Sequence, residues 1–229
     1  MDNKMKAVIA GVIGLVVMTT VIFSLNGKST PAAVAENFIK TVKDWATAVE
    51  TAENKEEIKD ATKEAISEIN ELIPKAIVDL SSYVEGYGGF AELSKPSNSA
   101  AMIGEFQSTI KEWEDLERRL NNISPEIVDK NQKIISTMND KDYEEMVKFT
   151  LDAFVNTVKI ISEDKKSMGA VNALAKEIAL SFGNEKFTPL KKEDIDKMVS
   201  DYKKRYENIS YDELVKRLRK DFRFLEDIL

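Results

Sequence analysis

Residues 29–49 read STPAAVAENFIKTVKDWATAV, and their apolar side chains recur every three or four positions. The recurring residues are Val34, Phe38, Val42, Trp45 and Val49. This spacing is that of one face of an α-helix, and a hydroxyl residue followed by proline, as in Thr30–Pro31, is a common helix start. We therefore expect an amphipathic helix that begins near Pro31 and must pack its apolar face against a partner.

The same helical spacing continues to the end of the chain. Further helix starts combine a capping side chain with a proline or with an acid three positions later. They are Asn54 with Glu57, Ser124–Pro125, Asp142 with Glu145, Thr188–Pro189 and Ser210 with Glu213. Pro74 predicts a kink near Asn70, and Gly183 suits a C-terminal cap. With no strand run after residue 29, we expect an all-α fold, an extended or compact multi-helix bundle.

A charge-free run, AVIAGVIGLVVMTTVIFSL, occupies residues 7–25. As a helix of 19 residues it would be about 28 Å long, close to the bilayer core of about 30 Å. This length favours an uncleaved signal-anchor, a transmembrane helix that ties the chain to the lipid bilayer. A secretory signal peptide cleaved at Ala33-Val34-Ala35 and a buried core helix remain as alternatives, although signal peptides usually have apolar regions of only about 7–15 residues.

Charges beside the apolar run predict its orientation. Lys4 and Lys6 precede it and Lys28 follows, which favours a cytoplasmic N-terminus and an extracytoplasmic body in a bacterial envelope. Residues 1–28 hold one acid and three bases, a net charge of +2, so the chain's −7 leaves −9 on residues 29–229. An acidic body argues against nucleic acid as a partner. Small-residue pairs, Ala7/Gly11 and Ala10/Gly14, would allow a homo-oligomer through the anchor.

The stretch EGYGGFAELSKPSNS, residues 85–99, is rich in glycine and predicts a loop. It would join two helical halves, residues 29–84 and 99–229, of the extracytoplasmic domain. Its aromatic residues, Tyr87 and Phe90, either pack onto the bundle or contact a partner.

A basic cluster, KRLRKDFR, occupies residues 216–223. Its bases are Lys216, Arg217, Arg219, Lys220 and Arg223. They could contact an anionic membrane surface, a cell-wall polymer or an acidic partner. The other interpretation is a solvated helix face with ion pairs to neighbouring acids such as Asp221 and Glu226.

The composition excludes much catalytic chemistry, because the chain contains no histidine and no cysteine. Imidazole bases, thiolate nucleophiles, zinc sites of the His or Cys type and disulfides are all absent. The segment NDKDYEE at residues 139–145 offers oxygen ligands, but a calcium loop from Asp140 would need glycine at Glu145 and an acid at Leu151. We expect no catalytic residues, no cofactor, no metal and no enzyme activity.

Two short segments resemble known families. LIPKAIV at residues 72–78, followed by Tyr83 and Gly86–Tyr87, resembles the LIPN segment of LemA-type envelope proteins, which are anchored helical bundles; Lys75 stands where that family has asparagine. STPAAVAENF at residues 29–38 is similar to the opening helix of exported nuclear transport factor 2-like domains, which continue into a curved sheet. We assign neither family from these segments.

Together these features predict a single-pass, membrane-anchored helical envelope protein. Residues 1–28 would form the cytoplasmic tip and anchor, and residues 29–229 a non-enzymatic binding or scaffold module with an unknown protein or cell-wall partner. The alternative is a secreted helical effector or toxin-like protein, released by cleavage near Ala35.

Overall fold

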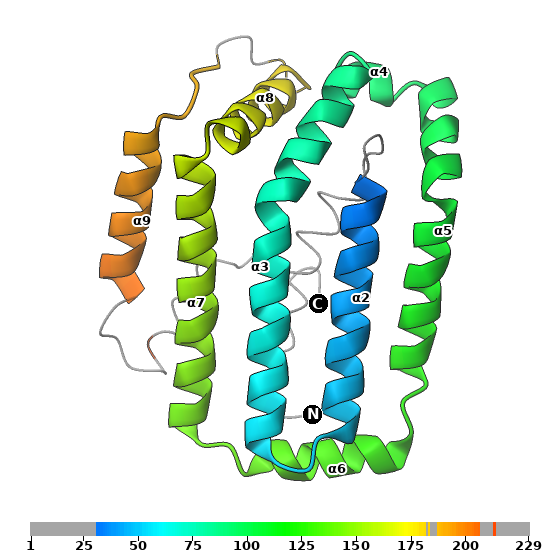
Figure 1. Cartoon of the computed structure of the whole chain (residues 1–229), viewed down its shortest axis with the longest axis vertical. Coiled ribbons are helices and arrows are strands. Elements are labelled where there is room, and N and C mark those ends of the chain that lie inside the picture. Colours follow the sequence, from blue (N-terminus) through cyan, green and yellow to red (C-terminus); the bar gives the residue numbers. More distant parts are fainter. Residues whose placement is uncertain (1–30, 182, 184–186, 207–212, 214–229) are drawn as a thin grey trace.

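The computed structural model describes residues 31–181, 183, 187–206 and 213, and this part of the chain contains eight helices and no strand (Figure 1). The helices are α2 (Pro31–Thr51), α3 (Lys55–Gly86), α4 (Phe90–Leu93), α5 (Pro96–Asn121), α6 (Pro125–Ser136), α7 (Asp140–Glu163), α8 (Lys165–Ser181) and α9 (Lys192–Tyr206). The prediction of an all-α helical bundle is confirmed.

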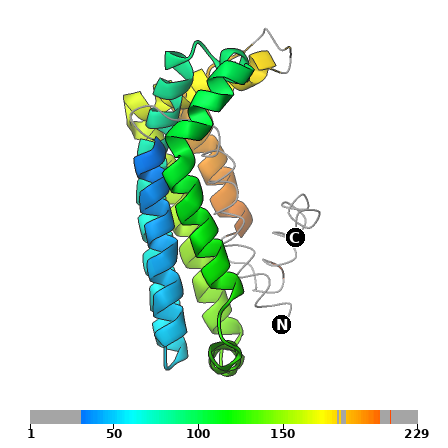
Figure 2. The same cartoon turned by 90° about the vertical axis from the view of Figure 1, so that its right-hand side faces the viewer.

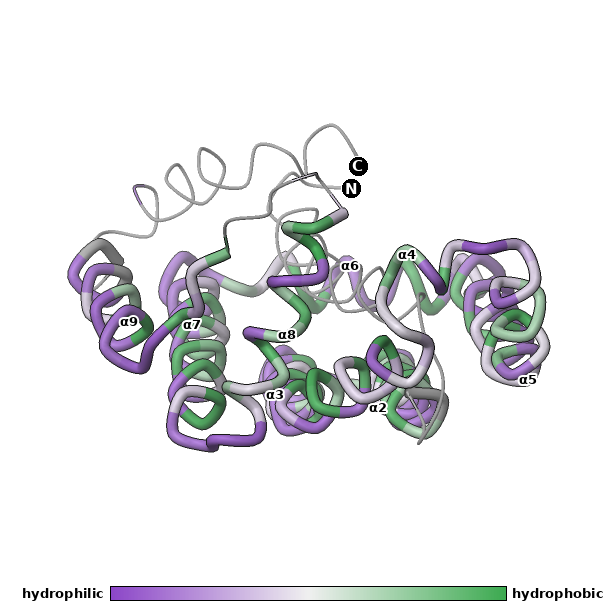
Figure 3. The backbone as a smooth tube through the Cα atoms, turned by 90° about the horizontal axis from the view of Figure 1, so that it is seen from above, coloured by the Kyte–Doolittle hydropathy of each residue, from purple (hydrophilic) through white to green (hydrophobic). Residues whose placement is uncertain are grey.

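Five of the long helices lie side by side in the order α5, α2, α3, α7 and α9 (Figure 1). Seen from above, this layer is curved, and α4 and α8 lie on its concave side (Figure 3). The twelve-residue α6 crosses the lower end of the layer, with its axis roughly at right angles to those of the long helices (Figures 1 and 2). Among the described helices, α5 and α9 each have one long neighbour, so these helices form an open curved layer.

The main apolar core lies where α2, α3 and α5 meet. Its buried members are Phe38, Ile39, Val42, Ile69 and Leu116. Four other apolar side chains are partly buried around them: Trp45, Leu72, Trp113 and Leu120. Phe38 and Val42 belong to the predicted face of the first helix, so that prediction is confirmed. A second core joins α3, α4 and α8 at the upper end through Leu80, Tyr83, Val84, Leu93 and Leu174.

Residues 85–99 are mostly helical, so the prediction of one long loop is wrong. Only Tyr87–Gly89 and Ser94–Lys95 separate the helices there. Gly88 and Gly89 have φ angles of +82° and +105°, which let the chain reverse direction within three residues. Pro96 is the first residue of α5, a position that suits proline's missing N–H, so this helix begins three residues before the predicted start at Ser99.

Two of the predicted helix starts are displaced. The N-cap of α7 is Asn139 rather than Asp142, because the Asn139 side chain accepts hydrogen bonds from the N–H groups of Lys141 and Asp142. The last described helix begins at Lys192 rather than at Thr188–Pro189. The Asn172 side chain of α8 donates one hydrogen bond to the Leu190 carbonyl and accepts another from the Leu190 N–H. These contacts hold the Leu190 backbone outside any helix.

Other predicted caps are present as expected. Asn54 accepts the Glu57 N–H and caps α3, and Ser124 accepts the Ile127 N–H and caps α6. Gly183 has a φ of +72°, as a left-handed cap requires.

The predicted membrane anchor, residues 7–25, lies outside the described residues, as do the basic cluster at 216–223 and Ser210. Among the described helices, none combines the length and the apolar character needed to cross a bilayer.

Candidate functional site

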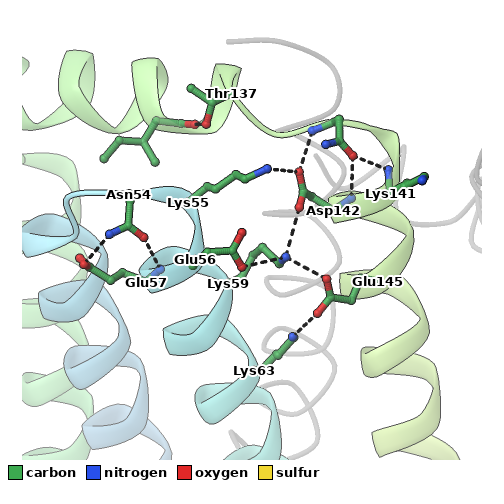
Figure 4. Close-up of polar contacts among 12 residues, drawn as sticks. Asn54, Lys55, Glu56, Glu57, Lys59, Lys63, Thr137, Lys141, Asp142 and Glu145 are labelled. Atoms are coloured by element: carbon green, nitrogen blue, oxygen red, sulfur yellow. Dashed lines mark hydrogen bonds and ion pairs between the residues drawn. The ribbon is translucent and has the colours of Figure 1, made fainter.

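The densest group of charged side chains in the described part of the chain joins the lower ends of α3 and α7 (Figure 4). We call it the α3–α7 charge cluster: Lys55, Glu56, Lys59 and Lys63 of α3 with Asp142 and Glu145 of α7. Lys59 is its centre, with a side chain only 6% exposed. The Lys59 Nζ lies 2.8 Å from Glu145 Oε2, 3.1 Å from Asp142 Oδ1 and 3.1 Å from Glu56 Oε2.

Two further lysines complete the pairing within this cluster. Lys55 Nζ donates to Asp142 Oδ2 at 2.8 Å, and Lys63 Nζ donates to Glu145 Oε1. Asp142 Oδ2 also accepts the Asn139 N–H at 2.9 Å, as the second half of a capping box. The carboxylate of Asp142 therefore stabilises the start of α7 and ties it to α3.

Each titratable group at the centre of the cluster is held in its charged form. Hydrogen bonds to Glu145, and then to Glu56 and Asp142, raise the pKa of the Lys59 ammonium well above its usual value despite burial. Lys55 and the Asn139 N–H hold the pKa of Asp142 well below its usual range, and Lys59 and Lys63 lower the pKa of Glu145. Groups with such pKa values neither accept nor release a proton near neutral pH, so the cluster is unsuited to general acid–base chemistry.

The cluster is equally unsuited to holding a cation, because its carboxylates already face three ammonium groups. Among the described residues, no three acidic side chains are arranged to ligate a metal ion. The sequence signal that could have located this cluster is the spacing of Lys55, Lys59 and Lys63 along one helix face. Their acidic partners on α7 lie more than 80 residues away, and pairing them requires the fold.

Tyr87 and Phe90, the predicted partner contacts, both pack against the upper core. The Tyr87 ring lies 4.7 Å from the Tyr83 ring, centroid to centroid. The Phe90 N–H donates to Glu177 Oε2 of α8 at 3.2 Å, so the first N–H group of α4 has a hydrogen-bond acceptor. Both side chains are partly buried and serve the contact between α4 and α8 in this structure. The other predicted contacts, Lys216, Arg217, Arg219, Lys220 and Arg223, lie outside the described residues.

The apolar residues of the edge helix α5 recur at helical spacing, but some of them are buried and others are exposed. Phe106 and Leu116 are buried, with Leu116 packed against α2. Ile103 and Ile110 are instead 58% and 43% exposed. Helical spacing alone would place these four residues on one face, but α5 has one long neighbour among the described helices, and its apolar stripe is wider than that contact.

A separate hollow lies between α7 and α9. It is lined by Lys159, Asp196, Val199, Ser200, Lys203 and Lys204, and it opens to solvent. Sequence reasoning did not find it, because its lysines come from two helices that only the fold brings together.

No known protein family, curated protein or solved structure matches this chain.

Proposed function

We propose that this chain is a single-pass, membrane-anchored envelope protein whose helical body is a non-enzymatic binding or scaffold module. The apolar run at residues 7–25 supports the anchor by its length and its lack of charge. The lysines that flank the run support an extracytoplasmic body.

The observation that carries the binding role is the exposed apolar surface of α5. Ile103 and Ile110 lie two helical turns apart, so they project from nearly the same side of the helix. Burying an isoleucine side chain completely is worth about 1.5–3 kcal/mol, and large apolar groups that recur on one helix face are typical of a packing surface. A partner helix laid along α5 would extend the layer by one more member.

The paired state of the α3–α7 charge cluster supports a role in binding rather than in catalysis. The buried charged side chains of the described chain, Lys59 and Asp142, are used to join two helices, and their pKa values are shifted away from neutrality. Enzymes commonly shift such values toward neutrality.

Cell fractionation with intact-mass measurement tests the anchor. We expect the full-length chain in the membrane fraction. A soluble chain that starts near Glu36 would overturn the anchor and favour the secreted effector.

Cross-linking tests the α5 surface, and the absence of native cysteine makes it specific. Ile103→Cys and Ile110→Cys, each labelled with a photoactivatable maleimide, should give one discrete cross-linked species. Lys75→Cys, on the exposed side of α3, is the matched control and should give none. A mass of two chains would identify a second copy as the partner, whereas equal labelling from all three positions would contradict a specific surface.

A further inference from the structure

The contact between α7 and α9 is apolar at its centre and basic at its margin. Val155 of α7 packs against Ile195 and Val199 of α9. Val199 also lines the hollow beside this contact, together with Lys159 of α7 and with Ser200, Lys203 and Lys204 of α9. The two helices thus hold three ammonium-bearing side chains around one opening.

These three lysines differ from the lysines of the described chain that are held in ion pairs. Lys40, Lys95 and Lys148 each lie within 3 Å of a carboxylate oxygen. The side chains of Lys159, Lys203 and Lys204 make no hydrogen bond or ion pair within the described structure. In a chain with a net charge of −7, three cations without a carboxylate partner at one hollow form a local positive region.

One carboxylate, that of Asp196, also lines the hollow. It lies 3.9 Å from Lys192 Nζ, which itself lies 3.7 Å from Glu163 Oε1. The lining therefore holds three positive charges and one negative charge, an excess of two. An anion placed there would lower the mutual repulsion of the lysines and would be repelled only by Asp196.

We propose that this hollow binds a phosphate-bearing ligand through Lys159, Lys203 and Lys204, with the Ser200 hydroxyl as an additional hydrogen-bond donor. Lysine ammonium groups bind phosphate as point charges, and a phosphate group offers several acceptor oxygens to donors from different directions. The hollow's volume of about 390 Å³ exceeds that of a bare ion and falls within the range of small-ligand sites. The ligand class is a phosphate ester, either free in solution or as a lipid headgroup.

This site is separate from the α5 surface and needs neither the anchor nor a protein partner. Its test therefore fails or succeeds independently of the proposed function.

The experiment is a calorimetric titration of the full chain, in a neutral detergent at low ionic strength, with glycerol 3-phosphate. A parallel arm titrates the same detergent-solubilised chain with short-chain phosphatidylglycerol and, for comparison, with short-chain phosphatidylcholine. We expect saturable binding that the triple variant Lys159→Gln, Lys203→Gln, Lys204→Gln weakens by about tenfold or more, which corresponds to about 1.4 kcal/mol. Asp196→Asn should strengthen binding, because it removes the repelling charge.

The matched control is the triple variant Lys75→Gln, Lys111→Gln, Lys133→Gln. These lysines are also exposed and make no ion pair within the described structure, so the control changes net charge equally at other places. We expect it to bind as the unaltered chain does. An equal loss in both triple variants, or no saturable binding in either arm, would overturn the site.

The two arms separate the possible sources of the phosphate. Lysine-dependent binding of glycerol 3-phosphate indicates a free ligand, and lysine-dependent binding restricted to phosphatidylglycerol indicates a lipid headgroup; both support the site. Far-UV circular dichroism checks that each variant is folded. If the triple variant unfolds, the single variants Lys159→Gln and Lys203→Gln replace it, and each should weaken binding.

Discussion

Gly89 occupies the tightest backbone position of the described chain. Its φ of +105° lies in a region that residues with a Cβ rarely adopt. The Glu177 carboxylate accepts the Phe90 N–H and lies beside the position that a Cβ on residue 89 would occupy. The backbone conformation therefore requires glycine here, and an added Cβ would also displace this carboxylate at the end of a flexible side chain.

Gly89→Ala should lower the free energy of unfolding by about 1–3 kcal/mol, the usual cost of a strained backbone position. Urea unfolding followed by circular dichroism measures this. The matched control is Gly104→Ala in the middle of α5, where an added Cβ meets nothing within 4 Å. That control should raise stability by about 0.5–1 kcal/mol, because alanine favours a helix interior. If Gly104→Ala also lowered the free energy of unfolding, the effect at Gly89 would not come from its strained backbone position.

The ammonium of Lys59 contacts three carboxylates in a nearly buried position. Lys59→Met preserves much of the volume but removes the ammonium shared by Asp142 and Glu145. We expect a loss of about 1.5–3 kcal/mol, typical of charge-assisted hydrogen bonds, in the same unfolding assay. Lys40→Met removes an exposed pair with Asp44 four residues away and should cost much less, because solvent screens this pair. Similar losses in the two variants would show that burial adds nothing to the Lys59 contacts.

At the scale of the element, α3 depends on a contact from α7. Pro74 lies within α3 and cannot donate to the Asn70 carbonyl one turn earlier. The helix changes direction in its upper half (Figure 1). At this point the Thr157 hydroxyl of α7 donates to Asn70 Oδ1 at 2.9 Å and lies 3.4 Å from the Asn70 carbonyl oxygen. The sequence predicted the kink, but not the threonine beside it.

Thr157→Val should destabilise the protein by about 1–3 kcal/mol, because it leaves the buried Asn70 side chain without this donor. Thr150→Val is the control on the same helix, since the Thr150 hydroxyl bonds only to the Met146 carbonyl of its own helix. It should change stability by less than about 1 kcal/mol. Thermal unfolding of both variants distinguishes the bridge from a general effect of valine.

Helix boundaries show where local sequence rules succeed and where they fail. Proline after a capping residue correctly located α6, because that signal is complete within two residues. The same signal failed at Thr188–Pro189, where Asn172 from another helix holds the adjacent backbone. Asp142 was predicted as a cap and is the third helical residue instead, because Asn139 three residues earlier supplies the capping side chain. Local rules thus predicted that helices form, and contacts from other elements decided some of their ends.

At the scale of the whole molecule, the α3–α7 charge cluster makes stability depend on pH. The folded structure lowers the pKa of Asp142 and of Glu145, so their stabilising contribution is complete above their usual pKa values of about 3.9 and 4.3. It is lost as the pH falls below these values toward those of the folded state. Lys59 has the opposite sign: its pKa is raised, so its contribution is lost as the pH rises above the usual value of 10.5.

We therefore expect the melting temperature to fall between pH 5 and pH 2 and to fall less in Asp142→Asn than in the unaltered chain. Circular dichroism melts across this range measure the effect. Asp44→Asn, which alters an exposed pair on α2, should keep the pH profile of the unaltered chain. If the Asp142→Asn profile also ran parallel to that of the unaltered chain, the cluster would not be the source of acid sensitivity.

The sequence by itself determined the helical class, most of the buried face of α2 and the reactive groups that the chain lacks. These properties follow from residue spacing and composition, which depend only on neighbours along the chain. Only the tertiary structure decided that the helices form an open curved layer, that Ile103 and Ile110 of α5 remain exposed, and that Lys59 meets Asp142 and Glu145. It also brought Lys159 beside Lys203 and Lys204. Such pairings join residues tens of positions apart, and they depend on which helix faces pack together, a choice that helical periodicity leaves open.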